Sequence, residues 1–574
     1  MKLTDLKRRF HSLLHVLSSF VPIIRKGNRF VRFCYRYKSF KMAKLPLHTK
    51  LAIGGICSFV FGIGFGWMAF PKILRSQIKK QIALKPGAEI RDMWSVVPFP
   101  LDFKVHLFNV TNADEVQNNG AIPIVNEVGP FFYDEYKEKV DLIDREEDDS
   151  VIYKQRVTWV FNKEKSGPGL TEDTEIVFPH MMMLAIIMAT VKEKPSALGI
   201  VGKGLNSIFH NPPSLFMKMK VGELLFTGLP VDCEVSDFGG SAICSVLKEE
   251  ATDLIEEREN FYRFSLFGAK NHTIQPDTLR VLRGTKNYKD VGRVIEWREK
   301  PEMQMWAGPP CNQYNGTDTT IFPPLMGPED DIVSFGAEIC RSLSAKFQQH
   351  TVTKGVKTLR YTAELGDPST DPDLKCFCDT PDTCLTEGLY DLRQCVGAPI
   401  IGTLPHFYLT DKKYLKLVKG LNPDPEKHAI VMDFEPMTAT PINGRKRLQF
   451  NMMIGPVDKV KLAKNLPNCL LPLFWVEEGI LLGDEYVNKV KIVYKALMAV
   501  AIMKWLNVLG GLGMCGASGY LYYKNRGKES KLDITKVSPQ NSNRIGSGGE
   551  EKKWQQMNIS TIQAATVPPN LDRD

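Results

Sequence analysis

The sequence predicts a membrane-anchored α+β protein, in which an antiparallel β framework decorated by helices is held between two transmembrane helices. Three observations support this prediction. Two stretches, 51–70 and 505–523, contain no charged residue. Segments between them alternate apolar and polar residues with a period of two, as half-buried strands do. Nine of the 12 cysteines also lie between them, which favours a folded domain in an oxidising compartment.

Each uncharged stretch has the length of a membrane span. Leu51–Phe70 holds 20 residues, and a helix of about 20 residues covers the roughly 30 Å of hydrocarbon in a bilayer. Trp505–Tyr523 is less apolar but begins and ends on aromatic residues, which favour the membrane interface. The predicted organisation is a basic segment 1–50, a span 51–70, an ectodomain 71–504, a span 505–523 and a tail 524–574.

The charge of the chain is concentrated at its ends. The whole chain carries +9, and residues 1–50 alone hold 13 Lys and Arg against one Asp. With a further net of +3 in 524–574, the remaining 71–504 carries −6. A basic nucleic-acid-binding domain is therefore excluded. The N-terminal excess predicts a cytosolic N-terminus, and the Ser-, Gly- and Gln-rich tail is expected to be disordered.

Three glycosylation sequons, at Asn109, Asn271 and Asn315, fall in the predicted ectodomain. Glycan acceptors and a cysteine cluster on the same segment indicate that it lies outside the cytosol. We therefore expect a plasma-membrane protein with two spans, an extracellular ectodomain and both termini in the cytosol.

Small residues recur every four positions in the first span, at Gly54, Ser58, Gly62 and Gly66. Such a stripe lets two helices approach closely. It is expected to pack against the second span or against another chain.

Local patterns predict individual elements of the ectodomain. Val151–Phe161 and His428–Phe434 alternate like strands, and Asn443-Gly444 before Leu448–Ile454 is typical of a hairpin turn. The long, Met-rich run Phe178–Val191 predicts a helix.

The Met-rich helix has two interpretations. A stripe of methionines usually belongs to a core, and this is the favoured interpretation of Met181, Met182 and Met183. Alternatively, methionine adapts to varied apolar ligands, so the helix would line a binding site. Lysines that follow it, such as Lys192 and Lys194, are either a solvated face or receivers of acidic or amphiphilic ligands.

The sequence lacks recognisable catalytic equipment. No Gly-x-Ser-x-Gly, His-Glu-x-x-His or phosphate-loop motif is present, so neither an enzyme nor a cofactor is predicted. Cys376, Cys378, Cys384 and Cys395 lack the two-residue spacing of a zinc knuckle, and disulfides are favoured over metal. Cys233 and Cys244 are candidates to pair with each other, which leaves Cys469 as a candidate free thiol.

Several motifs together resemble the class B scavenger receptor family. They are Val128–Phe131 (VGPF), Cys311–Pro323 (CNQYNGTDTTIFP), Glu338–Ser342 (EICRS), Cys376–Cys378 (CFC), Gly397–Asp411 (GAPIIGTLPHFYLTD), Gly420–Pro423 (GLNP) and Arg445–Asn451 (RKRLQFN). The likeness covers nearly all of 45–525 and includes both spans. Within the family, the chain looks most like the sensory neuron membrane proteins of insects.

The resemblance implies a fold and a disulfide pattern. The fold is an antiparallel β-barrel-like core with short helices and an apical helical bundle, enclosing an apolar tunnel that runs toward the membrane. The implied disulfides are Cys311–Cys376, Cys340–Cys395 and Cys378–Cys384. We expect these bridges to brace the membrane-proximal half of the ectodomain against local opening.

The resemblance also implies a ligand-capture role for the apex. The family's apical bundle matches the Met-rich helix, where a basic pair, here Lys192 and Lys194, helps capture anionic lipids. In this sequence Glu193 separates the two lysines and dilutes their field. Small, weakly polar ligands are therefore expected in place of lipoproteins.

The implied function is that of a non-enzymatic receptor or co-receptor for lipophilic odorants such as fatty-acid-derived pheromones. Such ligands would arrive on odorant-binding proteins and pass through the tunnel to an odorant receptor and its co-receptor in chemosensory neurons. The implied partners are lipophilic small molecules and the membrane, without nucleic acid. The alternative is a scavenger receptor that takes up lipids, lipoproteins or dying cells.

Overall fold

The computed structural model describes residues 45–251, 253–380 and 382–534. Within them the chain forms two compact units, one of residues 63–505 and one of the flanking helical segments 45–62 and 506–534. The predictions for the basic segment before residue 45 and for the tail after residue 534 lie outside the described residues.

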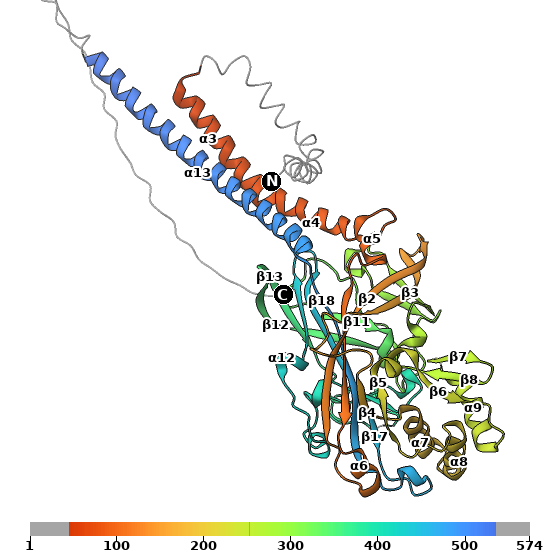
Figure 1. Cartoon of the computed structure of the whole chain (residues 1–574). Coiled ribbons are helices and arrows are strands. Elements are labelled where there is room, and N and C mark those ends of the chain that lie inside the picture. The colour runs from red at the N-terminus through yellow and green to blue at the C-terminus, as the bar shows by residue number, and fades with distance from the viewer. Residues whose placement is uncertain (1–44, 252, 381, 535–574) are drawn as a thin grey trace, which may run out of the picture. The chain divides into compact units, whose positions relative to one another are not determined.

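Two long helices contain the predicted spans (Figure 1). The first consists of α3 (Leu47–Ile63), a π-helical segment Gly64–Ala69 and α4 (Phe70–Gln81) in direct succession. The second is α13 (Asp484–Ile534), a single helix of 51 residues. Both are long and apolar enough to cross a membrane. The first helix continues past Pro71, which stands at the start of α4 directly after the π-helical segment.

The ectodomain is built on one antiparallel sheet of 13 strands. Its main path runs β10-β9-β3-β2-β1-β18-β17-β16-β13-β12-β11, and β14 and β15 branch from β17. The strands are β1 (Leu101–Val110), β2 (Val125–Arg145), β3 (Ser150–Phe161), β9 (Ile274–Leu282), β10 (Val294–Trp297), β11 (Ile332–Gly336), β12 (Arg341–Thr353), β13 (Val356–Ala363), β14 (Tyr390–Asp391), β15 (Ile400–Thr403), β16 (Ile430–Glu435), β17 (Thr440–Ile454) and β18 (Cys469–Leu481).

A short segment at Gly316 and Thr317 joins the two edge strands and nearly closes the sheet into a barrel. The Val294 amide of β10 donates to the Gly316 carbonyl (3.0 Å), and the Thr317 amide donates to the Val333 carbonyl of β11 (3.1 Å). Gly316 has a φ of 84°, and a Cβ there would lie 2.0 Å from the Val333 oxygen. Only glycine fits this position, which explains its place in the motif Cys311–Pro323.

Two small sheets and several helices decorate the barrel. The sheets pair β4 (Glu175–Pro179) with β5 (Phe216–Lys220), and β6 (Leu229–Asp232) and β7 (Leu254–Arg258) with β8 (Phe261–Phe264). The helices are α5 (Glu89–Ser95), α6 (Ala113–Asn119), α7 (Met181–Glu193), α8 (Leu198–Ile208), α9 (Phe238–Glu250), α10 (Pro309–Asn312), α11 (Arg393–Val396) and α12 (Pro425–His428). The predicted α+β class with a barrel-like core and helices is confirmed.

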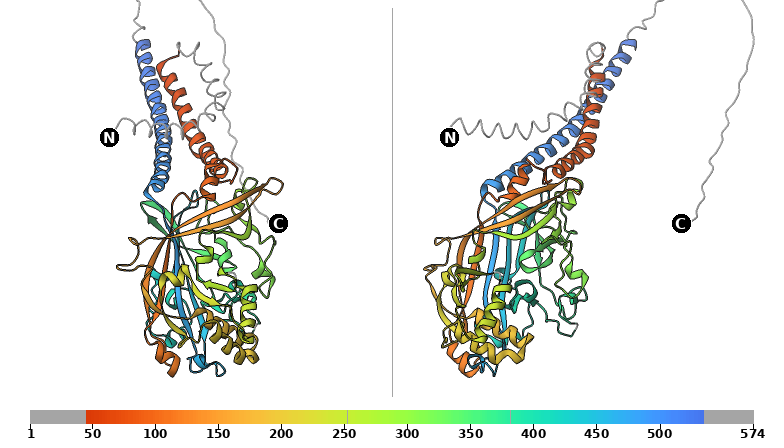
Figure 2. Two further views of the ribbon diagram at one scale, coloured as in Figure 1. Left: turned by 45° about the vertical axis from the view of Figure 1, so that its right-hand side comes forward. Right: turned by 90° about the vertical axis from the view of Figure 1, so that its right-hand side faces the viewer.

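The ectodomain has two distinct ends. Helices α6, α7, α8 and α9 gather at one end, and α4 and the start of α13 lie at the opposite end (Figures 1 and 2). We call these the apical end and the basal end. The basal end is the one from which the chain continues into the candidate spans.

Two local predictions are wrong. Phe178 and Pro179 belong to β4, and the Met-rich helix begins only at Met181, after its N-cap His180. Asn443-Gly444 lies inside β17, opposite Asp433 and Met432 of β16. The hairpin instead turns at 436–439, where the Glu435 carboxylate accepts hydrogen bonds from the Met437 and Thr438 amides (both 2.8 Å). The pairing of β17 with β16 thus overrides the local preference of Asn-Gly for a turn. The predicted strand Val151–Phe161 is confirmed as β3.

Candidate functional site: the apical helices and the cysteine-bonded loops

Helix α7 is anchored in the core by its first turn. The His180 ring accepts a hydrogen bond from the Met183 amide (3.4 Å), which caps the helix. Burial lowers the pKa of His180 to about 4, so the ring stays neutral and keeps a nitrogen free to accept. This turn therefore has a fixed position.

The methionines of α7 belong to the core of the ectodomain. Met181, Met182 and Met183 are buried and pack in the main hydrophobic cluster, together with Leu184 and Ile187. This is the first of the two interpretations that the sequence allowed. A direct ligand contact for the three methionines stays a prediction.

Helices α8 and α9 pack through glycines at very close range. A Cβ on Gly204 of α8 would lie 2.4 Å from the Gly239 carbonyl carbon of α9. The disulfide Cys233–Cys244 ties α9 to the end of β6, and the Asp237 carboxylate caps α9 by accepting from the Gly240 amide (2.8 Å). The glycine-rich run in α8 therefore serves helix packing.

Large apolar side chains are exposed on these apical helices. They include Phe238 at the start of α9, which is 77% exposed, and Ile200 of α8, which is 47% exposed. The two lie near each other, because the Ile200 carbonyl abuts Gly239. Val191 of α7 and Val246 of α9 are also exposed. We call these four residues the apical apolar set; sequence reasoning missed it, since no periodicity marks Phe238.

Lys192 forms an ion pair at the apical end. Its ammonium group lies 2.7 Å from Asp379, which also binds the Arg393 guanidinium (2.6 Å). Asp379 stands in the small loop that the Cys378–Cys384 disulfide closes. The positive charge of Lys192 is therefore compensated, while Lys194 is exposed at the end of α7. Anionic-ligand capture by either lysine stays a prediction.

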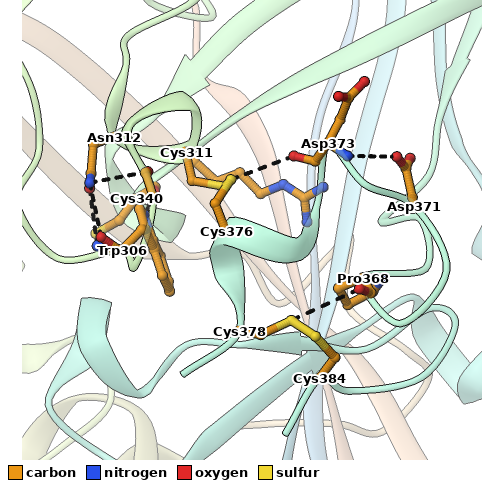
Figure 3. Close-up of a disulfide and its surroundings, with 12 residues drawn as sticks. Trp306, Cys311, Asn312, Cys340, Pro368, Asp371, Asp373, Cys376, Cys378 and Cys384 are labelled. Carbon is orange, nitrogen blue, oxygen red and sulfur yellow. Dashed lines mark hydrogen bonds between the residues drawn. A yellow bond between two sulfur atoms is a disulfide. The ribbon is translucent and has the colours of Figure 1, made fainter. Parts of the chain in front are cut away.

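Four disulfides are present among the described residues (Figure 3 shows two of them). Three of them, Cys311–Cys376, Cys340–Cys395 and Cys378–Cys384, are the pairs that the resemblance implies. The expected membrane-proximal location is wrong for the last of these, because its loop contacts Lys192 at the end of α7. Cys469 is a buried free thiol.

A partly buried His–Glu cluster lies between strands β1, β2 and β18. Glu127 of β2 binds His106 of β1 through one carboxylate oxygen (2.6 Å) and His406 through the other (2.8 Å). The His406 ring stacks on His428 at 4.4 Å, and the His106 ring stacks on Trp475 of β18 at 3.8 Å. We call these five residues the His–Glu cluster. No sequence signal pointed to it, because its members are far apart in the chain.

The cluster has perturbed protonation equilibria. Burial lowers the pKa of His428 to about 4, and burial also lowers that of His106. Burial tends to raise the pKa of Glu127, but hydrogen bonds with His106 and His406 outweigh it and hold that pKa well below its usual range. Within the described residues, no group of three or more His, Cys, Asp or Glu is arranged to hold a metal ion.

The three sequons differ in their surroundings. Asn315 is exposed. The Asn109 side-chain oxygen accepts from the Val177 amide (2.7 Å), and the Asn271 carboxamide bonds both the amide and the carbonyl of Trp159 (2.9 and 3.4 Å). Asn315 is the least encumbered of the three, whereas the contacts of Asn271 oppose the glycan that the sequence predicts there.

Small residues form a seam between the two candidate spans. Ser58 donates to the Asn507 carbonyl (3.0 Å), and a Cβ on Gly62 would lie 2.9 Å from Val508. The closest approach is at Gly55, where a Cβ would lie 2.7 Å from the Gly511 oxygen. Gly54 is less tightly packed, with its nearest neighbour at 3.9 Å. Ser58 and Gly62 of the predicted stripe thus contact the second span, whereas the tightest contact is made by Gly55, which is not part of that stripe.

Gly66, the last residue of the stripe, lies in the ectodomain unit. A Cβ there would lie 2.4 Å from the Lys504 side chain. The ammonium group of Lys504 lies 3.9 Å from the ring centre of Trp67, and Trp67 packs edge-on against Trp505. Aromatic and cationic residues thus meet where both helices enter the spans, as is typical of a membrane interface.

A barrel-like antiparallel sheet with disulfide-bonded loops, continuous at both ends with candidate spans, defines a membrane-tethered receptor fold. The chain belongs to the CD36 family, the class B scavenger receptors, whose family model matches residues 53–522.

Its relatives include insect proteins named Sensory neuron membrane protein 1. The protein from Apis mellifera is 55% identical over 526 residues, which cover 92% of this chain and 99% of that protein. The one from Plutella xylostella is 45% identical over 87% of this chain and 96% of its own length. The one from Manduca sexta is 40% identical over 92% of this chain and its full length.

Proposed function

We propose that this chain is a non-enzymatic receptor of sensory neurons that captures lipophilic odorants at its apical end and passes them on toward an odorant receptor in the same membrane. Both termini lie in the cytosol and the ectodomain is extracellular. The names of the relatives support the cell type. The single observation that carries the capture step is the apical apolar set, exposed at the end opposite the basal end.

The physical basis is the solvation of the ligand. A long-chain odorant gains about 0.8 kcal/mol for each CH₂ group removed from water. An exposed aromatic such as Phe238 gives such a chain a first contact when it leaves a carrier such as an odorant-binding protein. The apolar tunnel that would take the ligand further stays a prediction.

The ion pair at the apex supports weakly polar ligands. The Asp379 carboxylate already forms an ion pair with Lys192. Glu193, the next residue in the chain, carries a further negative charge. A carboxylate ligand would have to compete with Asp379 for the lysine. Esters, alcohols and aldehydes face no such competition.

Capture is tested by photo-crosslinking a diazirine-bearing fatty ester to the full chain in lipid nanodiscs. We expect labelling on α8 and α9, reduced at least severalfold by Phe238→Ser. Val352→Ser is the matched control, because Val352 is 65% exposed in β12 and is no part of the apical apolar set. Equal labelling of both variants would refute apical capture.

Ligand charge is tested with Asp379→Asn, which frees Lys192. The affinity for a fatty acid is expected to rise relative to that for its ethyl ester, and Lys192→Gln in the same background should cancel the rise. A ratio unaffected by both changes would remove Lys192 from the proposal.

Tissue localisation tests the alternative function, that of a scavenger receptor. Expression in haemocytes, gut or fat body in place of chemosensory neurons would favour uptake of lipids or dying cells.

A further inference from the structure

A strongly basic groove lies at the basal end of the ectodomain. It has a volume of about 480 Å³ and runs between α4 and the loop that follows β9. This volume falls in the range of small-molecule sites, roughly 300–1,000 Å³. Six cationic side chains line the groove: Lys72, Arg75, Lys79, Lys80, Lys85 and Lys286.

These cations have little internal compensation. None of the six forms an ion pair with a carboxylate in the part of the chain that the structure describes. The Lys286 ammonium group donates to the Glu147 carbonyl (2.8 Å), and that of Lys79 lies 4.1 Å from the ring centre of Tyr288. Glu146 is nearby, but Arg283 binds both of its carboxylate oxygens (2.7 and 2.9 Å). Like charges gathered in one groove repel one another until an anion enters.

An apolar pocket adjoins the basic groove. It has a volume of about 430 Å³ and shares Arg75, Lys79 and Tyr288 with the groove. Its remaining lining is apolar: Leu325, Met326, Pro436 and Met437. The two cavities therefore offer a polar and an apolar compartment side by side, as an amphiphile with an anionic head requires.

The groove is tied to the membrane by the chain itself. Helix α4 continues directly from the first candidate span, and Lys80 lies ten residues beyond Phe70. At 1.5 Å per residue, about 15 Å of helix separates them. Trp67, three residues before Phe70, packs against Trp505 of α13, and tryptophans are typical interfacial anchors. The groove therefore lies near the membrane surface, which favours a membrane lipid over a soluble anion as its ligand.

We propose that the groove binds the phosphate-bearing headgroup of a membrane phospholipid, with part of an acyl chain in the adjoining apolar pocket. Arg75 supplies a planar fork for the phosphate, and the lysines supply point charges around it. Such a lipid would hold the basal end against the bilayer. This inference is independent of apical ligand capture.

The test uses the full chain in nanodiscs that contain phosphatidylcholine and phosphatidylserine in equal amounts, with bound lipids counted by native mass spectrometry. We expect a preference for phosphatidylserine that falls at least tenfold in Lys72→Gln/Arg75→Gln/Lys80→Gln. The control Lys163→Gln/Lys203→Gln/Lys459→Gln removes the same charge from exposed lysines outside both cavities and should keep the preference. An unchanged preference in the groove variant would overturn the proposal.

Further arms identify the ligand source and exclude a folding artefact. Lys72→Arg/Lys80→Arg keeps the charge and should keep the preference. Inorganic phosphate or an acidic peptide that displaces phosphatidylserine at micromolar concentration would assign the groove to a soluble anion or a protein partner, and would overturn the lipid assignment.

The apolar pocket is tested separately. Met326→Ser/Met437→Ser should weaken binding of the long-chain lipid but leave that of its short-chain analogue unchanged. If both bind equally, the apolar pocket has no part in binding.

Discussion

The His406 ring nitrogen Nε2 lies 2.8 Å from the Oε2 atom of Glu127, although 279 residues separate them in the chain. The other oxygen of Glu127 binds His106 (2.6 Å), so one carboxylate connects β1, β2 and the segment that contains the motif Gly397–Asp411. His406 itself has a positive φ of 54°, and its backbone amide donates to Gln449 (2.6 Å). The strained backbone is thus held by buried hydrogen bonds.

Glu127→Gln is expected to lower the free energy of unfolding by about 1–3 kcal/mol, because the neutral amide leaves one of its two histidine partners poorly satisfied. The full decrease in the free energy of unfolding should be measured at pH values above about 4.3, the ordinary glutamate pKa. It should shrink as the pH falls further, because the depressed pKa of Glu127 stabilises the fold only while the unfolded-state carboxylate is ionised. Denaturant unfolding of the full chain in detergent measures this, with exposed Glu89→Gln as the control. Equal effects of the two variants would contradict the assigned role.

The stability of the ectodomain is expected to fall as the pH drops from about 6.5 to about 4. Folding holds the pKa of His428 at about 4, while the unfolded chain binds this proton near 6.5. The unfolded state therefore gains protons over this window and is favoured. Thermal unfolding of the full chain across this range should show a drop of several degrees, smaller in His428→Gln. If both proteins show the same drop, His428 does not contribute.

Gly55→Leu is expected to separate the two candidate spans, because a larger side chain at Gly55 meets the backbone of Gly511. Surface delivery and thermal stability should both fall. Gly513→Leu on the second span is a matched control, since a Cβ there meets no atom within 4 Å. Similar losses for both variants would show that the seam is not specific.

Asn315 is expected to be glycosylated and Asn271 to be unoccupied. Asn315 is exposed, whereas the Asn271 side-chain nitrogen, which would carry the glycan, donates to the Trp159 carbonyl (3.4 Å). Glycopeptide mass spectrometry of the chain from insect cells measures both sites. Asn315→Gln should remove a glycan, and Asn271→Gln should leave the glycan mass unchanged. A fully occupied Asn271 would contradict this expectation.

Much of the fold follows from local sequence, and the exceptions have a common cause. The strand β3 and the candidate spans were predictable, because alternation and apolar length are properties of single segments. The hairpin at Asn443-Gly444 was not, because β17 pairs through those residues with Asp433 and Met432. Similarly, the partner of Lys192 could not be foreseen, since Asp379 lies 187 residues away.

Local composition alone predicts two candidate membrane spans and places nine of the 12 cysteines and three sequons between them. The free energy of moving a segment from water into lipid depends on the composition of that segment, so it can be read locally. Which charges are neutralised and which are left unpaired depends on the three-dimensional fold. It gave Lys192 an acidic partner and gathered six cations in the groove beside α4, because an electrostatic interaction depends on distances in space that a linear sequence does not contain.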